Sequence, residues 1–452
     1  MAKGLKPIIN QLFPERIFRD SAKVLVGQMT GHAIIFLSGP LLSRLYSPEE
    51  FGTYALMSSI AALLSIISTG GYEFAIINVK EDKEAQVLSI LSISGSLITA
   101  IIAACILLFL TIKTEAIKNG MAGAGWGLLP AFVLFQGIYN TANFTLNRQK
   151  KYETISFART LRALAMVPIQ LFLGGLNFAF GLFLGMVSGH MTGMLFQLRK
   201  IYKQLIYNIK IVNFKKLKTT ALKNYKFPAF FMPEELINSA SVQAPIFLLK
   251  FFFNQASIGL YALPQKLLSI PIVLIGNSLG QIYFRNAALE YTNPDKLLNT
   301  TLRLFRYLFF LGLLPFSFLM VYGDIIVPYI FGDEWYESGI YTMILSPWLF
   351  FVLIGSPLSN IFPVKGKQKL SLTINLYMLT GRILAFMAGV FLFENAIISV
   401  ALFSGISFCF WFFIAFYNLY LVKARIRPEI LKVLSIWFLN LLIFFLIRKS
   451  IA

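Results

Sequence analysis

The sequence predicts an all-α protein that crosses a membrane many times, and three observations support this prediction. Of the 452 residues, 57% are hydrophobic and 13% are charged, whereas a soluble domain has about 45–50% apolar and about 25% charged residues. Apolar runs of about 20 residues, the length of a membrane-spanning helix, recur along the chain. Lys and Arg gather in alternate loops between these runs, as expected when the basic loops stay in the cytoplasm.

Twelve spans are predicted from the apolar runs. In chain order they cover residues 22–45, 51–79, 85–112, 126–147, 154–175, 177–198, 228–253, 258–285, 300–322, 338–363, 371–393 and 395–422. A thirteenth apolar run, 430–447, is just long enough to span a bilayer core, or else it lies along the interface or packs on the bundle. The trailing Arg448 and Lys449 argue against export of the C-terminus.

The net charge of +20 would fit a nucleic-acid-binding protein, but the positions of the charges argue against this reading. The basic residues occur mainly in loops on one side of the predicted membrane, namely 1–23, 80–84, 147–153, 199–226, 285–306, 365–369 and 423–432. This is the positive-inside pattern, so we expect a cytoplasmic N-terminus and no nucleic-acid partner. Cys105 and Cys409 both lie in apolar segments, and we expect neither a disulfide nor a metal site.

Two stretches of the chain are similar at a constant offset. Residues 45–56 read "LYSPEEFGTYAL" and residues 252–263 read "FFNQASIGLYAL", and each follows the first helix of a set of six. Because six is even, the two halves enter the membrane in the same direction and form a parallel repeat with a pseudo-two-fold axis along the membrane normal. The predicted parts are a six-helix bundle 1–198, a basic cytoplasmic linker 199–227, a second six-helix bundle 228–422 and a basic segment with an apolar helix 423–452.

The repeated stretches also carry local helix signals. Ser47 and Glu50 form a predicted capping box at the first copy, and Asn254 is a predicted N-cap at the second. Gly52 and Gly259, which occupy equivalent places, allow close helix approach. Tyr54 and Tyr261, which also occupy equivalent places, suit the interfacial aromatic belt of a membrane protein.

Three segments carry a resemblance to a known family: "GPLLSRLYSPEEFGTYAL" at 39–56, "GGYEFAI" at 70–76 and "NQASIGLYALPQKLL" at 254–268. With them the chain resembles the polysaccharide flippases of the multidrug/oligosaccharidyl-lipid/polysaccharide (MOP) exporter superfamily. The resemblance implies two helical bundles like those of the MATE transporters. It also implies movement of polyprenyl-diphosphate-linked oligosaccharides, such as O-antigen units of lipopolysaccharide, across the bacterial inner membrane by alternating access. Membrane lipids, a polysaccharide polymerase and a chain-length regulator are the implied partners.

Polar side chains follow one face of three predicted helices. Unsatisfied polar groups in hydrocarbon cost several kcal/mol, so these faces contact protein or water. Hydrogen bonding between helices remains the simpler reading, and a water-filled central cavity is the functional one. The polar residues are Gln136, Asn140, Asn143 and Asn147 in 126–147, Glu234, Asn238 and Ser241 in 228–253, and Gln28 and His32 in 22–45.

Charged residues inside the predicted spans are the candidate substrate ligands. Arg382 is about 12 residues from either end of its helix, or ~18 Å, which is too far for its side chain to reach the membrane surface. It is expected either to face the cavity and bind a diphosphate or to pair with Glu73 or another carboxylate. Arginine binds phosphate groups through two parallel hydrogen bonds. The further candidates are Lys266, Arg159 and Arg162, and, with interface anchoring as the favoured alternative, Arg44 and Lys250.

Glu234, His32 and Glu73 are the candidates for coupling transport to a proton or sodium gradient. Pairing with loop Lys or Arg is the alternative role of the two acids, and helix packing is that of the histidine. No phosphate-binding GxxxxGK[ST] motif occurs, so ATP is not the expected energy source, and no cofactor is expected.

The predicted function is therefore that of a lipid-linked oligosaccharide flippase, not an enzyme. An ion-coupled multidrug antiporter of the same superfamily is the first alternative, although a carrier of organic cations is expected to have unpaired carboxylates and aromatic cages. A membrane glycosyltransferase or polysaccharide polymerase is the alternative from another class. Such enzymes need a set of reacting groups, usually on a large exterior loop, and the predicted exterior loops are short.

Overall fold

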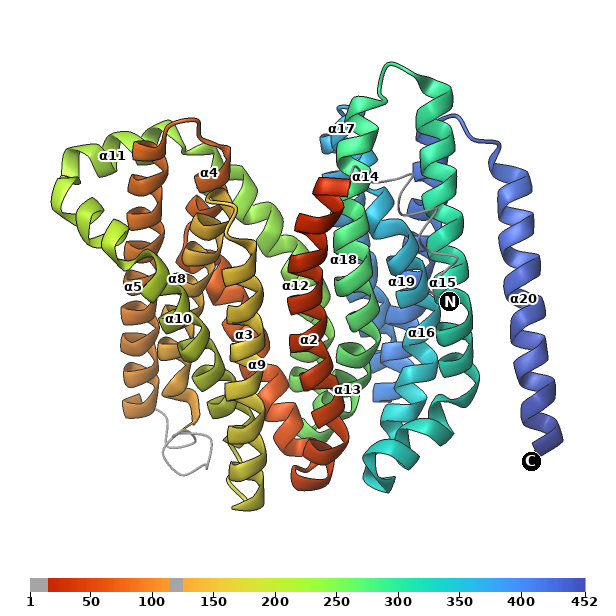
Figure 1. Cartoon of the computed structure of the whole chain (residues 1–452). Helices are drawn as coiled ribbons and strands as arrows, with labels where there is room; N and C mark the ends of the chain where they lie inside the picture. The colour runs from red at the N-terminus through yellow and green to blue at the C-terminus, as the bar shows by residue number, and fades with distance from the viewer. Residues whose placement is uncertain (1–14, 114–124, 452) are drawn as a thin grey trace. The chain divides into compact units, whose positions relative to one another are not determined.

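The computed structural model describes residues 15–113 and 125–451, without the side chains of 15–28, 111–113, 203–211, 277, 368 and 451. Within these residues every regular element is a helix (Figure 1). In chain order they are α2 (Glu15–Leu45), α3 (Pro48–Ser68), α4 (Tyr72–Asn78), α5 (Asp82–Lys113), α8 (Leu128–Arg148), α9 (Tyr152–Gly175), α10 (Gly181–Ile211), α11 (Phe214–Lys223), η1 (Phe227–Phe231), α12 (Met232–Phe252), α13 (Gln255–Pro271), η2 (Ile272–Gly276), α14 (Asn277–Leu289), α15 (Pro294–Phe331), η3 (Asp333–Trp335), α16 (Tyr336–Leu358), α17 (Ile361–Val364), α18 (Gln368–Phe393), α19 (Ala396–Leu421) and α20 (Ile426–Ile451).

Three of the predicted spans are interrupted. The span predicted at 51–79 stops at Ser68 and resumes as α4, because Gly70 and Gly71 both adopt positive φ, 61° and 72°, a conformation that ends a helix and suits glycine. The eighth span contains the π-helical turn η2 directly after Pro271, and the tenth ends as the short helix α17. The seventh predicted span, 228–253, begins within the π-helical turn η1 and continues as α12. Each of the remaining predicted spans coincides with one long helix.

Nine helical segments of the described chain are long and apolar enough to cross a membrane, judged by length and composition. They involve α3, α5, α9, α13 with α14, α15, α16 with its short neighbours, α18, α19 and α20. The other long helices, α2, α8, α10 and α12, include those that carry the polar stripes. The protein is thus a multi-pass membrane protein, as predicted.

The chain forms two compact units. Unit 1 contains the residues up to Tyr46 and Met57–Ala240, and unit 2 contains Ser47–Leu56 and Ser241–Ala452. Helices α3 and α12 therefore each contribute residues to both units. The domain limits drawn from the sequence at 198, 227 and 422 stay predictions.

The two copies of the repeated stretch contact each other within unit 2. A Cβ atom at Gly52 would lie 2.0 Å from the carbonyl oxygen of Gln255, and one at Gly259 would lie 1.9 Å from that of Pro48. These pairs are reciprocal at the offset of the repeat, as a local two-fold axis between α3 and α13 requires. The predicted close approach at the two glycines is confirmed.

The predicted caps at these helix starts are also confirmed. The backbone N–H of Ser47 donates to Glu50 Oε2 at 2.8 Å, and that of Glu50 donates to Ser47 Oγ at 3.4 Å. Asn254 Oδ1 accepts from the N–H of Ser257 at 2.8 Å. The aromatic-belt prediction is wrong for Tyr261, which is fully buried because its ring packs edge-on against Tyr341.

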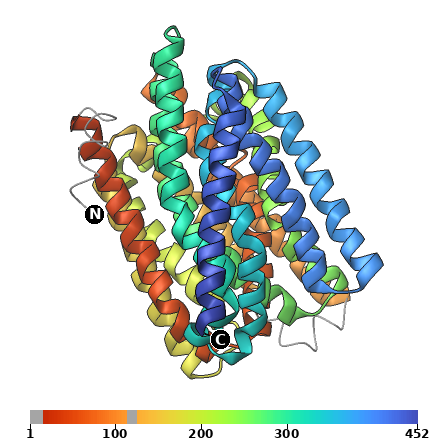
Figure 2. The same cartoon turned by 90° about the vertical axis from the view of Figure 1, so that its right-hand side faces the viewer.

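Helix α20 runs alongside α15 in unit 2 (Figures 1 and 2). Arg306 pairs with Glu429 at 2.6 Å near the start of α20, and Asp324 pairs with Arg448 at 2.7 Å near its end. The earlier residue of α15 contacts the earlier residue of α20, and the later contacts the later, so the two helices run parallel. The thirteenth apolar run is therefore part of a 26-residue helix packed on the bundle. The end of α20 therefore lies at the opposite end of α15 from the basic α14–α15 turn. This placement does not fit the expectation that Arg448 and Lys449 keep the C-terminus on the basic side, and the ion pair with Asp324 offsets the charge of Arg448.

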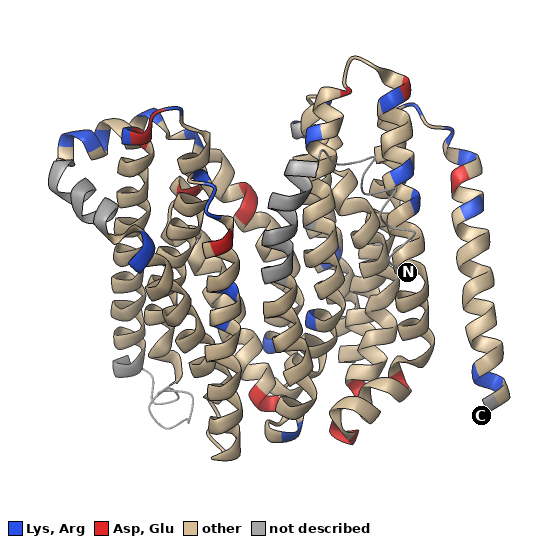
Figure 3. Cartoon of the chain, viewed as in Figure 1, with Lys and Arg blue, Asp and Glu red and all other residues tan. Residues whose placement is uncertain are grey.

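The basic residues gather at one end of each unit (Figure 3). In unit 1 this end carries α11 and the α4–α5 turn, and in unit 2 it carries the α14–α15 turn and the start of α20. The distribution agrees with the alternation of basic loops in the sequence. The assignment of this end to the cytoplasm stays a prediction.

Candidate functional site

The interior of unit 1 is organised by three glycines of α10. Gly185, Gly189 and Gly193 follow one another at intervals of four and face α9 and α8. A Cβ atom at Gly189 would lie 2.8 Å from the carbonyl oxygen of Arg162, and one at Gly193 would lie 3.0 Å from the ring of Tyr139. Small residues at this spacing let membrane helices approach closely. The stripe therefore brings the arginines of α9 next to α10.

Arg162, His190 and Tyr139 form one contact group. Nη1 of Arg162 lies 3.1 Å from Nε2 of His190, and Nδ1 of His190 lies 2.8 Å from the carbonyl oxygen of Met186. Because the carbonyl only accepts, His190 carries its proton on Nδ1, and Nε2 accepts from the guanidinium. The Arg162 guanidinium also lies 5.7 Å from the centre of the Tyr139 ring. A neutral imidazole and an aromatic face thus hold a positive charge without neutralising it.

Arg159 interacts with the same tyrosine. It lies one turn before Arg162 on α9, and its Nη1 is buried without a hydrogen-bond partner in the described residues. The hydroxyl of Tyr139 lies near the Arg159 guanidinium but has no hydrogen bond of normal geometry to a described residue. Among the described side chains no carboxylate lies within 4.0 Å of Arg159 or Arg162. The pair, which we call the unit 1 arginine pair, carries two positive charges without a carboxylate partner among the described side chains.

The predicted amide stripe lies on α8 in the same unit. Gln136 Nε2 donates to Asn140 Oδ1 at 3.1 Å, and Gln197 Nε2 of α10 donates to Asn143 Oδ1 at 3.3 Å. Gln136, Asn140 and Asn143 are half-buried, and Oε1 of Gln136 has no partner in the described part of the chain. The amides bond partly to one another and retain free hydrogen-bonding capacity.

Arg382 has an environment that the sequence did not predict. Its side chain is 1% exposed, so in this structure it faces no open cavity. Nε donates to Ser407 Oγ and Nη1 donates to Ser241 Oγ, each at 2.8 Å. Its guanidinium carbon lies 4.9 Å from the ring centre of Trp348 and 5.3 Å from that of Phe403.

Both sequence-based expectations for Arg382 therefore differ from this geometry. No described carboxylate forms an ion pair with it. Instead two hydroxyls and two aromatic faces, contributed by α12, α16 and α19, hold the guanidinium. A buried cation is tolerated in this way when hydrogen bonds and ring electrons replace water. Its contact with substrate stays untested.

The other predicted cations lie in unit 2 or near helix ends. Lys266 is exposed, and its Nζ lies 5.2 Å from the ring centre of Tyr54. Lys250 Nζ donates to Gln255 Oε1 at 3.0 Å. Arg44 is exposed in the last turn of α2. The positions of Arg44 and Lys250 suit anchoring at the membrane interface, whereas Lys266 lies within a candidate span.

Glu73 lies on α4, outside the nine candidate spans, directly after the break at Gly70 and Gly71. Its side chain is 3% exposed, and Oε2 has no hydrogen-bond partner among the described residues. Burial, with a smaller contribution from the negative charge of Glu235, raises the pKa of the Glu73 carboxyl to about 7. The expected pairing of Glu73 with a loop Lys or Arg is not seen in the described residues.

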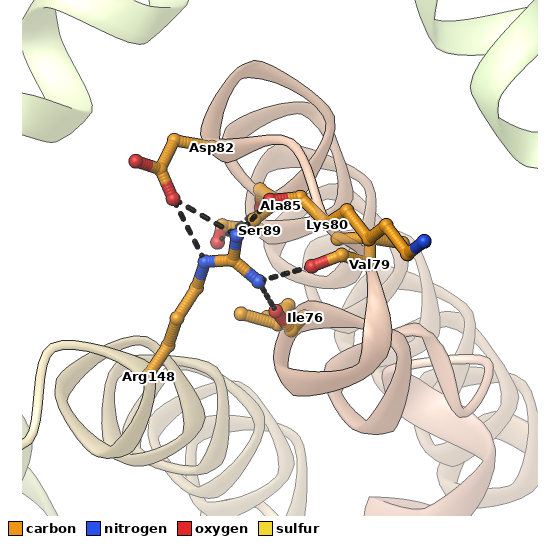
Figure 4. Close-up of polar contacts among 7 residues, drawn as sticks. All are labelled: Ile76, Val79, Lys80, Asp82, Ala85, Ser89 and Arg148. Carbon is orange, nitrogen blue, oxygen red and sulfur yellow. Dashed lines mark hydrogen bonds and ion pairs between the residues drawn. The ribbon is translucent and has the colours of Figure 1, made fainter.

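The other end of α4 is fixed by Arg148, the last residue of α8 (Figure 4). Its Nη1 donates to the carbonyl oxygens of Ile76 and Val79, and its Nε and Nη2 donate to Asp82 Oδ1 at 3.1 and 2.9 Å. A cation at a helix C-terminus satisfies free carbonyls and the helix dipole. Arg148 thus joins α8, α4 and α5, and it holds the helix that carries Glu73.

The other two coupling candidates are less buried than Glu73. His32 is half-buried on α2, and Glu234 is exposed at the start of α12. The side chain of Gln28 lies outside the described residues. In the described part of the chain no group of three or more His, Cys, Asp or Glu residues could hold a metal ion, and Cys105 and Cys409 are free thiols.

The family follows from comparison with known proteins. The sequence model of the family described as "Polysaccharide biosynthesis protein" matches residues 41–339. The chain belongs to this family. No curated protein sequence matches the chain.

Solved structures with a similar fold cover most of this polysaccharide biosynthesis protein. An inward-facing multidrug resistance MATE family transporter of the MOP superfamily has a TM-score of 0.69 at 15% identity, over 88% of this chain and 94% of that chain. An outward-facing MATE transporter of the same superfamily gives 0.61 at 14%, over 93% and 98%. A MOP superfamily transporter from Pyrococcus furiosus, described by the reverse polarity of its binding pocket, gives 0.60 at 14%, over 90% and 95%. The chain therefore belongs to a polysaccharide biosynthesis family and has the fold of these MOP superfamily transporters.

Proposed function

We propose that this transporter moves polyprenyl-diphosphate-linked oligosaccharides, such as O-antigen units, across the bacterial inner membrane. The family match supports a role in polysaccharide biosynthesis, and the fold supports a carrier that alternates between two openings. A polysaccharide polymerase and a chain-length regulator would then act on the delivered unit. The proposal needs an anionic binding partner, because a diphosphate is the charged part of such a substrate.

The unit 1 arginine pair is the observation that carries the proposal. Arg159 and Arg162 bring two positive charges into the helical interior without a described carboxylate partner, and a buried guanidinium nitrogen remains unpaired. An unpaired buried charge is costly, so a bound anion would lower the energy of this arrangement. A diphosphate fits two guanidinium groups through bidentate, charge-assisted hydrogen bonds.

The neighbouring amides provide the second half of the proposed site. Gln136, Asn140 and Asn143 offer carbonyl oxygens and N–H groups that match sugar hydroxyls, which both donate and accept. In this assignment the diphosphate contacts the unit 1 arginine pair and the sugar contacts the amide stripe. Arg382, closed off by hydroxyls and rings, supports the packing of unit 2 in this state.

A deletion strain tests the function directly. Loss of the flippase should leave finished lipid-linked repeat units on the cytoplasmic face of the membrane, where added glycosidases reach them only after the membrane is opened. Incomplete repeat units would instead identify a glycosyltransferase. Finished units that reach the outer face of the membrane but are not joined into long polymer would identify a polymerase. Either of the last two outcomes overturns the proposal.

A binding experiment tests the site. The purified protein in nanodiscs is titrated with a polyprenyl diphosphate, the corresponding monophosphate and the neutral alcohol. Loss of one charge-assisted contact costs about 1.5–3 kcal/mol, so Arg159→Gln and Arg162→Gln should each weaken diphosphate binding by roughly 10- to 100-fold. Arg199→Gln, an exposed arginine of α10, is the matched control for the lost charge. Equal affinity for all three ligands, or tight binding of organic cations instead, would favour a multidrug antiporter.

Coupling to a proton gradient is the energy source that we infer for this cycle. Glu73 is the supporting residue, because it is buried, lacks a cation partner in the described chain and has a pKa near neutral. Uptake assays in vesicles with an imposed pH gradient, or with sodium alone, separate the two possible ions. Transport that depends on sodium and ignores pH would remove Glu73 from this role.

A further inference from the structure

Helix α11 has one face packed on unit 1 and one face without a protein partner. Its packed side bears Leu217, Thr220 and Ala221, which are half-buried, whereas its other positions are exposed. The next residue after the helix, Asn224, is buried and donates to Glu84 Oε1 at 2.8 Å, and Lys223 pairs with Glu84 Oε2 at 2.7 Å. Both contacts fix the helix to the start of α5, so its orientation about its own axis is set.

The free face of α11 combines apolar and basic side chains. Phe214 is 81% exposed and Leu222 is 63% exposed. Lys215 and Lys218 lie between them on the same side of the helix, because residues three and four apart share a face. Tyr225, just beyond the helix, is 52% exposed. A helix face that contacts only water is usually polar, whereas this face exposes a phenylalanine, a leucine and a tyrosine together.

The position of α11 restricts what can cover this face. The helix lies across the end of unit 1 and not along its long helices (Figure 1), at the end where Lys and Arg gather (Figure 3). It is joined directly to the long helix α10 on one side and to η1 and α12 on the other. A helix held at the end of a membrane-embedded bundle, with aromatic and aliphatic residues interleaved with lysines, has the composition of helices that lie in the membrane interface.

We propose that α11 is a membrane-surface helix that binds anionic phospholipid headgroups. Phe214, Leu222 and Tyr225 enter the boundary between headgroups and acyl chains, and Lys215 and Lys218 contact lipid phosphates. Charge complementarity favours anionic over neutral lipids, because each lysine near an anionic surface gains electrostatic attraction. The proposal is independent of the transported substrate.

Spin labels on the full-length protein test the depth of the helix. Cys105→Ser and Cys409→Ser first remove the free thiols. A label is then placed by Leu222→Cys or, as the control, by Lys216→Cys, an exposed position about 120° away around the helix. In bilayers with phosphatidylglycerol, the Leu222 label should be accessible to oxygen and protected from a water-soluble nickel complex, and the Lys216 label should show the reverse. Equal exposure of both labels to the nickel complex would overturn the proposal. Protection of the Leu222 label only after cell lysate is added would also overturn it, in favour of a protein partner.

Lipid selectivity tests the charge. The number of phosphatidylglycerol molecules retained by the purified protein, relative to phosphatidylcholine, should fall on the order of tenfold when Lys215 and Lys218 are both changed to Gln. Lys80→Gln with Lys83→Gln removes the same charge from exposed positions at the same end of unit 1 and should leave selectivity unchanged. If both double variants lose selectivity equally, the free face of α11 is not the site. If a polyprenyl diphosphate displaces the phospholipid at equimolar amounts, the surface belongs to the substrate instead.

Discussion

Replacing Gly259 by alanine tests the contact between the two copies of the repeat. The new Cβ atom would lie 1.9 Å from the carbonyl oxygen of Pro48, although ordinary contact begins near 3.4 Å. The missing distance is about 1.5 Å, and the opposing atoms belong to backbone, which cannot rotate away. Helices α3 and α13 must therefore separate. This also lengthens the hydrogen bond from Gln255 Nε2 to Thr53 Oγ1, which is 3.3 Å in the wild type.

The expected cost is that of overpacking a helix interface, about 1–3 kcal/mol, toward the upper limit because backbone meets backbone. Gly52→Ala should behave alike, since its Cβ would lie 2.0 Å from the oxygen of Gln255. The two substitutions open the same interface, so their combination should cost less than the sum. Gly405→Ala in α19 is the control. Nothing lies within 4 Å of a Cβ there, and alanine favours a helix by about 0.5–1 kcal/mol.

Thermal unfolding of the purified variants in detergent measures these effects. Gly52→Ala and Gly259→Ala should lower the midpoint temperature clearly, and Gly405→Ala should leave it equal or higher. Wild-type stability of Gly259→Ala, or strictly additive losses in the double variant, would show that α3 and α13 do not cross at these glycines.

Three further predictions follow from the described contacts. The folded state binds the Glu73 proton more tightly than the unfolded chain, so the free energy of unfolding should fall as pH rises from 4.5 to about 7. The fall should be at most on the order of 3 kcal/mol. Glu73→Gln should remove this pH dependence in unfolding curves taken across the same range. Arg382→Ala should destabilise the fold by about 3 kcal/mol, because hydrogen bonds are lost and a cavity is left. Arg382→Met keeps most of the side-chain volume and should cost less. Wild-type stability of the alanine variant would contradict the contacts of Arg382 with Ser241, Ser407, Trp348 and Phe403. On a cysteine-free background, Lys218→Cys should resist labelling from outside the cell and Ser450→Cys should accept it; the reverse pattern would invert the predicted orientation.

Much of the fold could be predicted because the membrane restricts the choices. Long apolar runs must be helices, since no water is present to satisfy their backbone groups, and local signals such as the Ser47 and Asn254 caps act within one turn. The break before α4 was readable from the adjacent Gly70 and Gly71, but the apolar run continues across both glycines and was predicted as one span. The predicted run 430–447 is shorter than α20 because it leaves out the charged residues near both ends of that helix.

The candidate site was harder to predict because its contacts join distant segments. The partners of Arg382 come from α12, α16 and α19, and no spacing rule links Ser241, Trp348 and Ser407 to it. The stripe Gly185, Gly189 and Gly193 was a readable signal for the close packing of α9 and α10 that places Arg162 beside His190. Tyr139 and Arg148 carry no motif, and only the packed helices reveal their roles.

The ion pair between Asp324 and Arg448 has a consequence for how the protein is made. The two residues are separated by 124 positions in the chain, so at a synthesis rate of about 5–20 residues per second the carboxylate emerges roughly 6–25 s before its partner. During that interval α15 sits in the translocation machinery or the bilayer with an unmatched negative charge near its far end. When α20 arrives, Arg448 neutralises the carboxylate of Asp324 and the ring of Trp437 packs against that of Phe351, with their centres 5.6 Å apart. Unit 2 is therefore expected to reach its final form only after α20 has been synthesised, and a stalled chain lacking α20 should be a preferred substrate for membrane proteases.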